Sequence, residues 1–312
     1  MGGNRVGPRL RSVVVRNVVG TVGKIFVTLG LLILLFVAYQ LWGTGIYESQ
    51  QQSKLASQFK QEIRKHPTTT TAEGAPAVTT TTAALPTPPP GDAIGHIVIP
   101  KIGVDKYVVQ GVGVPDLRKG PGHYPTTPMP GQAGNAAIAG HRTTYGAPFN
   151  RVDELDVGDP IEITTTQGTF TYKVDKKPFA VPPTQTDVLT PTADATLTLT
   201  TCNPKFSASQ RLIVQATLVL PKNETALPTA ASAPASTAKT KESLAQAEAT
   251  ATGTSLAPTY LWGFIVFFVG ALWWLLFHRY PRWTTWFVGV IPFLAVLFVF
   301  YVYLERVLPQ NY

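Results

Sequence analysis

Cysteine is almost absent from this chain. Cys202 is the only cysteine among 312 residues, so an internal disulfide is excluded. Nothing in the sequence has the ligand pattern of a zinc or haem site, and no glycine-rich segment has the strand-to-helix context that binds a nucleotide. The single thiol is therefore a reactive group, one half of an intermolecular bridge, or an inert core residue.

Acidic residues are also scarce: 18 Asp and Glu stand against 26 Lys and Arg, for a net charge of +8. Such an excess can indicate a nucleic-acid partner, but its distribution argues against one. Residues 1–24 hold five basic side chains and no acidic one, whereas residues 91–222 hold twelve basic and eleven acidic side chains. The excess belongs to membrane-flanking segments, and we predict no nucleic-acid partner.

Three long apolar runs cover 25–42, 260–277 and 283–304. A run of about 18 residues at ~1.5 Å rise crosses most of a ~30 Å hydrocarbon core, so we predict one N-terminal and two C-terminal transmembrane helices. The basic tail 1–24 and the basic loop 278–282 are predicted to be cytoplasmic. The segment between the first two spans and the C-terminal end are predicted to lie outside, in a multi-pass protein of the cell membrane. A cleaved signal peptide and a soluble buried hairpin are the alternatives.

Segments rich in Thr, Ala, Pro and Ser flank the middle of the chain, within 43–90 and 221–259. They lack the apolar surface that would offset chain entropy, so we predict an extracellular stalk and linker before the domain and a second linker after it. A short membrane-proximal helix is possible within 43–65. Residues 91–220 remain as one globular domain. We expect any chemistry to be confined to this domain and the membrane segments only to position it, because the linkers cannot transmit a defined conformation.

The signals within 91–220 are short strands punctuated by turns, with no long amphipathic helix. A hairpin is predicted at Gln167-Gly168. This pattern predicts an all-β barrel or sandwich. The predicted strands are 95–99, 106–110, 136–139, 159–166, 169–174, 195–201 and 212–220.

Three residues with complementary chemistry stand at the ends of predicted strands: Cys202 and His141 each follow a strand, and Arg211 opens one. A free thiol with a pKa of ~8.5 is mostly protonated at neutral pH, and a histidine can favour the thiolate and then protonate a leaving amine. A guanidinium supplies fixed donors to the oxygen that becomes negative in acyl transfer. Each residue alone could be structural; their shared position at strand ends favours a catalytic set.

An acidic cluster follows the His141 segment and could be mistaken for a calcium site. We interpret it as a solvated acidic turn and predict neither a metal nor a cofactor. Its members are Asp153, Glu154, Asp156 and Asp159.

The string TLTTC (198–202), with Arg211 downstream, resembles the TLxTC signature of sortases, the membrane-anchored cysteine transpeptidases of Gram-positive bacteria. The strings GHRTTYGAPF (140–149) and TTCNPKFS (200–207) are similar to class E and the related class D sortases of high-GC actinobacteria. The resemblance covers about residues 91–220.

The resemblance implies an eight-stranded β-barrel in which Cys202, His141 and Arg211 are catalytic. Cys202 would attack the Thr–Gly carbonyl of a C-terminal LAxTG or LPxTG sorting signal on a surface protein, and an amine of a cell-wall precursor would resolve the acyl-enzyme. The likeness to class E favours the Ala form of the signal. Further substrate contacts are predicted at Thr200, Thr201 and Tyr124.

The two C-terminal apolar runs depart from most class E sortases and are more typical of pilin-polymerising class C enzymes. Pilus assembly is therefore an alternative function, although the segment before the barrel lacks the Asp-Pro-aromatic element that closes many class C sites. A cysteine hydrolase that releases its product to water and a non-catalytic membrane adaptor are the remaining alternatives.

Overall fold

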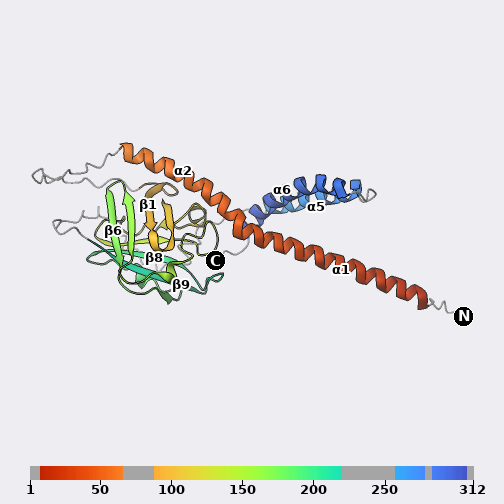
Figure 1. The fold of residues 1–312 in the computed structure, drawn as a ribbon, viewed down its shortest axis with the longest axis horizontal. Coiled ribbons are helices and arrows are strands. Elements are labelled where there is room, and N and C mark those ends of the chain that lie inside the picture. Colours follow the sequence, from red (N-terminus) through yellow and green to blue (C-terminus); the bar gives the residue numbers. More distant parts are fainter. Residues whose placement is uncertain (1–7, 66–87, 220–256, 278–282, 308–312) are drawn as a thin grey trace, which may run out of the picture. The chain divides into compact units, whose positions relative to one another are not determined.

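A computed structural model describes residues 8–65, 88–219, 257–277 and 283–307 (Figure 1). The chain divides into two compact units. One begins at Thr44 and holds all the described strands, and the other joins the N-terminal residues up to Gly43 with residues 256–306. The predicted loop 278–282, residues 66–87 and 221–256 of the predicted linkers, and the start of the basic tail lie outside the described residues, so the predicted domain boundaries there stay predictions.

Eight strands close into a barrel. The bounds of all nine described strands are β1 Ala93–Ile99, β2 Val104–Gln110, β3 Gly122–His123, β4 Gly134–Ala139, β5 Pro160–Thr165, β6 Gly168–Val174, β7 Phe179–Val181, β8 Ala195–Asn203 and β9 Gln210–Leu218. The order around the ring is β6-β5-β1-β2-β3-β4-β8-β9, and β6 pairs with β9 to close it. β7 lies outside the ring and pairs with the first part of β9. The predicted eight-stranded barrel is therefore confirmed.

Seven of these strands match predicted ones, and the predicted hairpin at Gln167-Gly168 joins β5 to β6. The sequence did not predict β3 and β7, which have two and three residues. Strands this short contain too few residues for an alternating pattern. β3 nevertheless joins β2 to β4, so the ring depends on it.

Two apolar clusters lie on opposite faces of the strands. Ile97 on β1, Leu199 on β8 and Val214 on β9 belong to the large buried cluster inside the barrel. Ile213 belongs to a second cluster with Val188. Because successive strand residues point to opposite faces, this second cluster covers part of the outer surface of the barrel.

Helix α2 (Thr44–Lys65) packs along the barrel (Figure 1). Leu55 and Phe59 are buried against Ala93 of β1 and Val109 of β2. The sequence allowed a short helix here within a stalk, but it did not predict that one face of the helix would be buried. This packing gives α2 a defined place on the barrel.

The other unit is helical. Its elements are α1 (Pro8–Ala38), the π-helical turn η1 (Tyr39–Gly43), α5 (Ala257–Phe277) and α6 (Trp283–Val307). By length and composition, α5 and the N-terminal helix from Val19 onward can each cross a membrane. The described apolar part of α6 is shorter, Gly289–Leu304.

The C-terminal part of α6 contacts both of its neighbours in this unit. Trp262 of α5 stacks on Tyr303 with ring centroids 6.2 Å apart, and Thr259 Oγ1 donates a hydrogen bond to Tyr303 O at 3.1 Å. The hydroxyl of Tyr301 donates to Leu32 O of α1 at 2.7 Å. The start of α5 therefore lies beside the end of α6, as expected for an antiparallel hairpin.

We expect Phe59→Ala to destabilise the barrel unit by about 3–5 kcal/mol, the cost of truncating a buried phenylalanine. Phe59 is 3% exposed, and its ring lies 5.9 Å from that of Tyr107. Val157→Ala is the control, because Val157 is 62% exposed and its truncation should change stability by less than about 0.5 kcal/mol. Urea unfolding of the detergent-solubilised protein measures both variants, and equal midpoints would contradict the packing of α2.

Candidate active site

The pairing of β8 with β9 sets Cys202 opposite Arg211. The two are direct partners in the antiparallel register, one residue before it ends. Directly opposite side chains on antiparallel strands share one face, with Cβ atoms ~4.5–5.5 Å apart. Both are buried, with 8% of Cys202 and 4% of Arg211 exposed. The two side chains therefore start from the same face of the sheet at the strand end.

Cys202 lies on the outer face of β8. Leu197 and Leu199 point into the barrel interior, so the alternate residues Thr198, Thr200 and Cys202 point away from it. A thiol on this face, at the end of its strand, can meet a ligand without entering the packed core.

The segment with His141 is bonded to the same strand end. Gly140 N donates to Thr200 O at 3.0 Å, and Gly140 O accepts a hydrogen bond from Thr201 Oγ1 at 2.7 Å. These bonds extend the parallel pairing of β4 with β8 beyond its last strand pair. The structure thus brings His141 to the strand end that also holds Cys202.

Arg142 is a site residue that the sequence analysis missed. Its side chain is 5% exposed, and Nη1 donates to Cys202 O at 3.2 Å and to Asn203 Oδ1 at 2.6 Å. Nη2 pairs with Asp153 at 3.2 Å. Arg142 therefore links the His141 segment to the backbone carbonyl of Cys202. Its only signal in the sequence is its place directly after the histidine.

His141 stands against an aromatic ring and near a cation. Its ring centroid lies 5.2 Å from that of Tyr145, and the guanidinium carbon of Arg118 lies 5.6 Å from the Tyr145 centroid. Burial, and then the positive charge of Arg118, lower the pKa of His141 to about 4. The residue is half-buried, but its Nε2 is fully buried and has no hydrogen-bond partner among the described residues. A neutral imidazole with an unused buried nitrogen is suited to accept a proton.

The three residues predicted to contact substrate are buried around the last part of β8. Tyr124 OH and Thr200 Oγ1 are 3.3 Å apart, and Thr201 Oγ1 is bonded to Gly140 O. Their hydroxyl groups link neighbouring segments of the barrel in this structure. Their contact with a substrate stays a prediction.

Basic side chains pair with the predicted acidic turn. Lys101 Nζ lies 2.7 Å from both Asp156 Oδ2 and Asp159 Oδ2, and Arg151 lies 2.6 Å from Glu154. The fourth carboxylate, that of Asp153, pairs with Arg142. No group of three or more metal-ligating side chains is found in the described part of the chain. The pairing favours a solvated ion-pair network over a calcium site.

A cavity of about 370 Å³ lies elsewhere in this unit. Gln58 of α2, Ile94 of β1, Gln132 and Gln167 are among its lining residues. Gln132 precedes the start of β4, whereas His141 follows the end of that strand. The cavity is therefore separate from the site described above.

Comparison with known proteins finds sortases among the relatives of this chain. A family model described as "Sortase domain" matches residues 97–219. Sortase D of Bacillus subtilis is 32% identical over 178 residues, which cover 56% of this chain and 84% of that protein. Sortase SrtE1 of Streptomyces coelicolor is 32% identical over 213 residues, which cover 64% of this chain and 56% of that protein. The chain thus spans just over half the length of SrtE1.

Solved structures of similar sequence include two sortases. Sortase E from Streptomyces avermitilis is 40% identical with a TM-score of 0.39, over 42% of this chain and 91% of that chain. A Clostridium perfringens Sortase D5 transpeptidase is 29% identical with a TM-score of 0.44, over 56% of this chain and 99% of that chain. Both alignments include nearly all of the solved chain.

We expect Arg118→Gln to raise the pKa of His141 from about 4 toward its ordinary value of 6.5, because a charge that disfavours the protonated ring is removed. The rise should be partial, since burial remains. An NMR titration of the His141 ring, in a Cys202→Ala background, measures it. Lys176→Gln is the matched control, because Lys176 also lies over a ring, that of Phe179, at 4.2 Å. An unchanged pKa in the Arg118 variant would mean that burial alone sets it.

Proposed function

This chain belongs to the sortase family, and on that premise we propose that it is a cysteine transpeptidase acting on C-terminal sorting signals of surface proteins. The observation that carries the proposal is the pairing of Cys202 with Arg211, at the strand end to which the His141 segment is bonded. A nucleophile, a proton carrier and a donor for an oxyanion thus stand together, as acyl transfer requires.

In the first half-reaction, the sulfur of Cys202 attacks the Thr–Gly carbonyl carbon of the signal. The thiol proton passes to Nε2 of His141, because the lowered pKa of about 4 keeps the ring neutral beforehand and Nε2 has no other hydrogen-bond partner among the described residues. Arg211 donates hydrogen bonds to the carbonyl oxygen as it becomes negative. The C–N bond then breaks, His141 returns the proton to the departing Gly amine, and a thioester to the Thr carbonyl remains.

In the second half-reaction, an amine attacks this thioester. His141 takes a proton from the attacking nitrogen and gives it to the leaving sulfur, so a new amide bond forms and the free thiol returns. We propose an amine of a cell-wall precursor as the acceptor, as the family resemblance implies. A lysine of a pilin subunit is the alternative acceptor, and water would give hydrolysis instead.

The placement of Arg211 supports its proposed role. Its Nη1 donates to Ala208 O at 3.2 Å, in the connection between β8 and β9, and to Gln210 O at 3.4 Å, at the first residue of β9. These bonds restrict rotation of the guanidinium. A donor that is already oriented costs no reorganisation when charge develops on the substrate.

We propose LAxTG signals as the preferred substrate. The strings 140–149 and 200–207 resemble class E sortases, and two of the similar curated proteins are Sortase SrtE1 and Sortase SrtE2 of Streptomyces coelicolor. The likeness to Sortase D of Bacillus subtilis keeps a class D enzyme as the second candidate within the same chemistry. Turnover of LAxTG and LPxTG peptides, measured side by side, decides the preference.

A multi-pass membrane protein with the barrel unit outside the cell is the arrangement we propose. The long apolar helices support membrane anchoring, and the basic residues of 1–24 and 278–282 support the orientation. Substrates of sortases are held at the same membrane surface, so anchoring raises the local concentration of both partners.

We expect Cys202→Ala to abolish transfer of a signal peptide to an added amine, and His141→Ala to be nearly as damaging. Arg211→Ala should lower turnover by roughly 10²–10³, the range for removal of one oxyanion donor. Arg211→Lys should recover only part of this loss, because an ammonium cannot present the same planar fork. The rate of transpeptidation by the detergent-solubilised full-length protein is the measurement.

Arg151→Ala is the matched control for the arginine variants. The Arg151 side chain is 51% exposed and pairs with Glu154 at the surface, so its loss should leave activity unchanged. Transfer that persists in Cys202→Ala would contradict the proposal. Product released only to water, with amine present, would indicate a cysteine hydrolase. A folded protein with neither activity would indicate a membrane adaptor.

We expect residues 278–282 to face the cytoplasm and Tyr312 to lie outside, because the basic loop is retained on the inner side. A tag at Tyr312 and a cysteine introduced at Thr284, in a Cys202→Ala background, can be probed in intact cells with membrane-impermeant reagents. The tag should react in intact cells, and the introduced cysteine should react only after lysis. If the tag at Tyr312 reacted only after lysis, one of the two C-terminal apolar runs would not span the membrane.

A further inference from the structure

The backbone leaves its usual conformations four residues after His141. Tyr145, Gly146 and Ala147 have φ values of 48°, 71° and 43°. Two of these residues carry a Cβ, for which the left-handed region is unfavourable. Such a turn persists only where surrounding contacts fix it. Several of those contacts come from α2.

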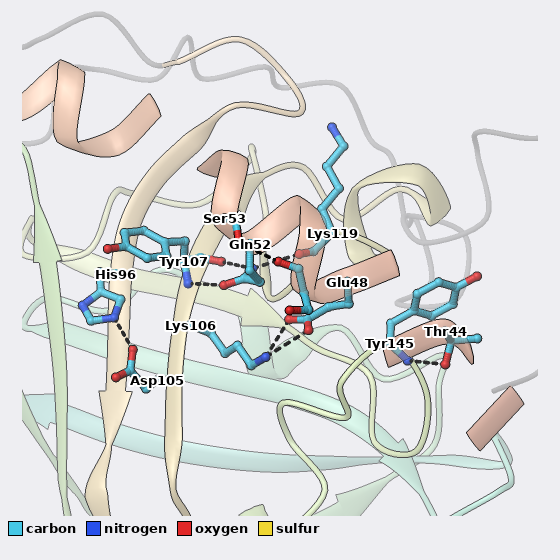
Figure 2. Close-up of polar contacts among 11 residues, drawn as sticks. Thr44, Glu48, Gln52, Ser53, His96, Asp105, Lys106, Tyr107, Lys119 and Tyr145 are labelled. Atoms are coloured by element: carbon cyan, nitrogen blue, oxygen red, sulfur yellow. Dashed lines mark hydrogen bonds and ion pairs between the residues drawn. The ribbon is translucent and has the colours of Figure 1, made fainter. Parts of the chain in front are cut away.

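Helix α2 meets this turn through three residues. Thr44 Oγ1 accepts a hydrogen bond from Tyr145 N at 3.1 Å (Figure 2), and the Tyr47 ring meets the Tyr145 ring edge-on at 6.2 Å. The Glu48 carboxylate lies so close to Gly146 that a Cβ there would stand 2.5 Å from Oε2. The spacing of the three residues on α2 places them on one face of the helix.

A buried ion pair anchors this face. The Glu48 side chain is 2% exposed and accepts hydrogen bonds from Lys106 Nζ of β2 at 2.8 and 3.0 Å (Figure 2). Burial raises the pKa of Glu48, and the bond and charge of Lys106 oppose that rise. Removing one partner of such a pair is costly because the other charge stays buried. The start of α2 is therefore held in one place on the barrel.

One turn further along α2, Gln52 bonds to two backbone segments. Its Oε1 accepts from Tyr107 N at 2.7 Å, and its Nε2 donates to Tyr107 O at 3.0 Å and to Lys119 O at 2.8 Å (Figure 2). The residue before Lys119 is Arg118, whose guanidinium lies over the Tyr145 ring. Helix α2 thus holds both the left-handed turn and the segment that carries the cation.

We propose that α2 is part of the catalytic unit, and that Thr44 and Glu48 are positioning residues for His141. They act through Tyr145, whose ring lies 5.2 Å from the imidazole. The inference rests on the proposed function, because the position of this imidazole matters to the rate only if it moves a proton. A small displacement of a catalytic group lowers the rate by a large factor.

A purely structural role for α2 has a different expectation. Leu55 and Phe59, in the second half of the helix, pack on β1 and β2. If α2 only stabilised the barrel, substitutions in either half would lower stability and leave kcat unchanged in the folded protein. If the first half positions His141, its substitution lowers kcat even where stability is retained.

The test compares Thr44→Val, Thr44→Ser and Glu48→Gln in the full-length protein, with Ser53→Ala as the matched control. Thr44→Val keeps the shape and removes the acceptor, whereas Thr44→Ser keeps the hydroxyl. Ser53 is an exposed residue of α2 whose hydroxyl donates to Ser49 O within the helix at 3.0 Å. We expect kcat to fall by about 10- to 100-fold in Thr44→Val and Glu48→Gln with KM changed less than about twofold. Thr44→Ser and Ser53→Ala should keep the parent values.

A second measurement does not depend on turnover. In a Cys202→Ala background, Thr44→Val should move the NMR titration midpoint of His141 upward from about 4, because the turn beside the ring loosens. Parent-like kcat, KM and titration in the folded variants would overturn the proposal. A parent protein without transfer activity, whose His141 titration still responds to Thr44→Val, would count against the proposed function and support the positioning contact.

Circular dichroism checks the folding of each variant. Glu48→Gln is the variant at risk, because it leaves Lys106 beside a neutral side chain. If it unfolds, Thr44→Val and its serine counterpart decide the outcome, since both keep the ion pair intact.

Discussion

The antiparallel pairing of β8 with β9 is the constraint on which the candidate site depends. It sets Cys202 opposite Arg211, and because side chains alternate between the two faces of a strand, it also directs both away from the packed interior. A slip of one residue would turn the thiol into the core and bring a leucine out. The register is supported on both sides, since β4 pairs with β8 and both β6 and β7 pair with β9. Closure of the barrel is thus what holds the candidate catalytic groups in place.

Cations dominate the surroundings of the thiol. Arg142 is bonded to the carbonyl of Cys202, Arg211 stands opposite on β9, and the charge of Arg118 acts on His141. Positive groups favour a thiolate or an oxyanion and disfavour an imidazolium, so the charge of Arg118 adds to burial, the larger cause of the low pKa of His141. This field suits a cycle in which negative charge develops on sulfur and oxygen while the imidazole carries its proton only briefly.

The candidate site residues could be predicted from the sequence, but the packing of α2 that supports them could not. Cys202, His141 and Arg211 could be found because each borders a segment with a strong strand pattern. The spacing of such segments predicted a barrel or a sandwich, and only the resemblance to sortases implied the eight-stranded barrel. The packing of α2 could not be found in this way. Its buried face contains polar residues, and Glu48 lies 58 residues from its partner Lys106. Periodicity reports which face of an element is apolar, but it carries no information about a polar contact between a helix and a distant strand. Strands β3 and β7 were not predicted for a related reason, because they are too short to show an alternating pattern of apolar and polar residues.

The closing of the ring also governs the order in which the chain can assemble. β9 is the last strand of the barrel, and it pairs with β8 on one side and with β6 and β7 on the other. Before it docks, β6 and β8 each present an open edge, and the partner of Cys202 is not yet in place. Pairings between distant segments form slowly, and open edges invite association with other chains. An unfinished chain therefore carries Cys202 without Arg211 opposite it, so the candidate catalytic arrangement arises only as folding is completed.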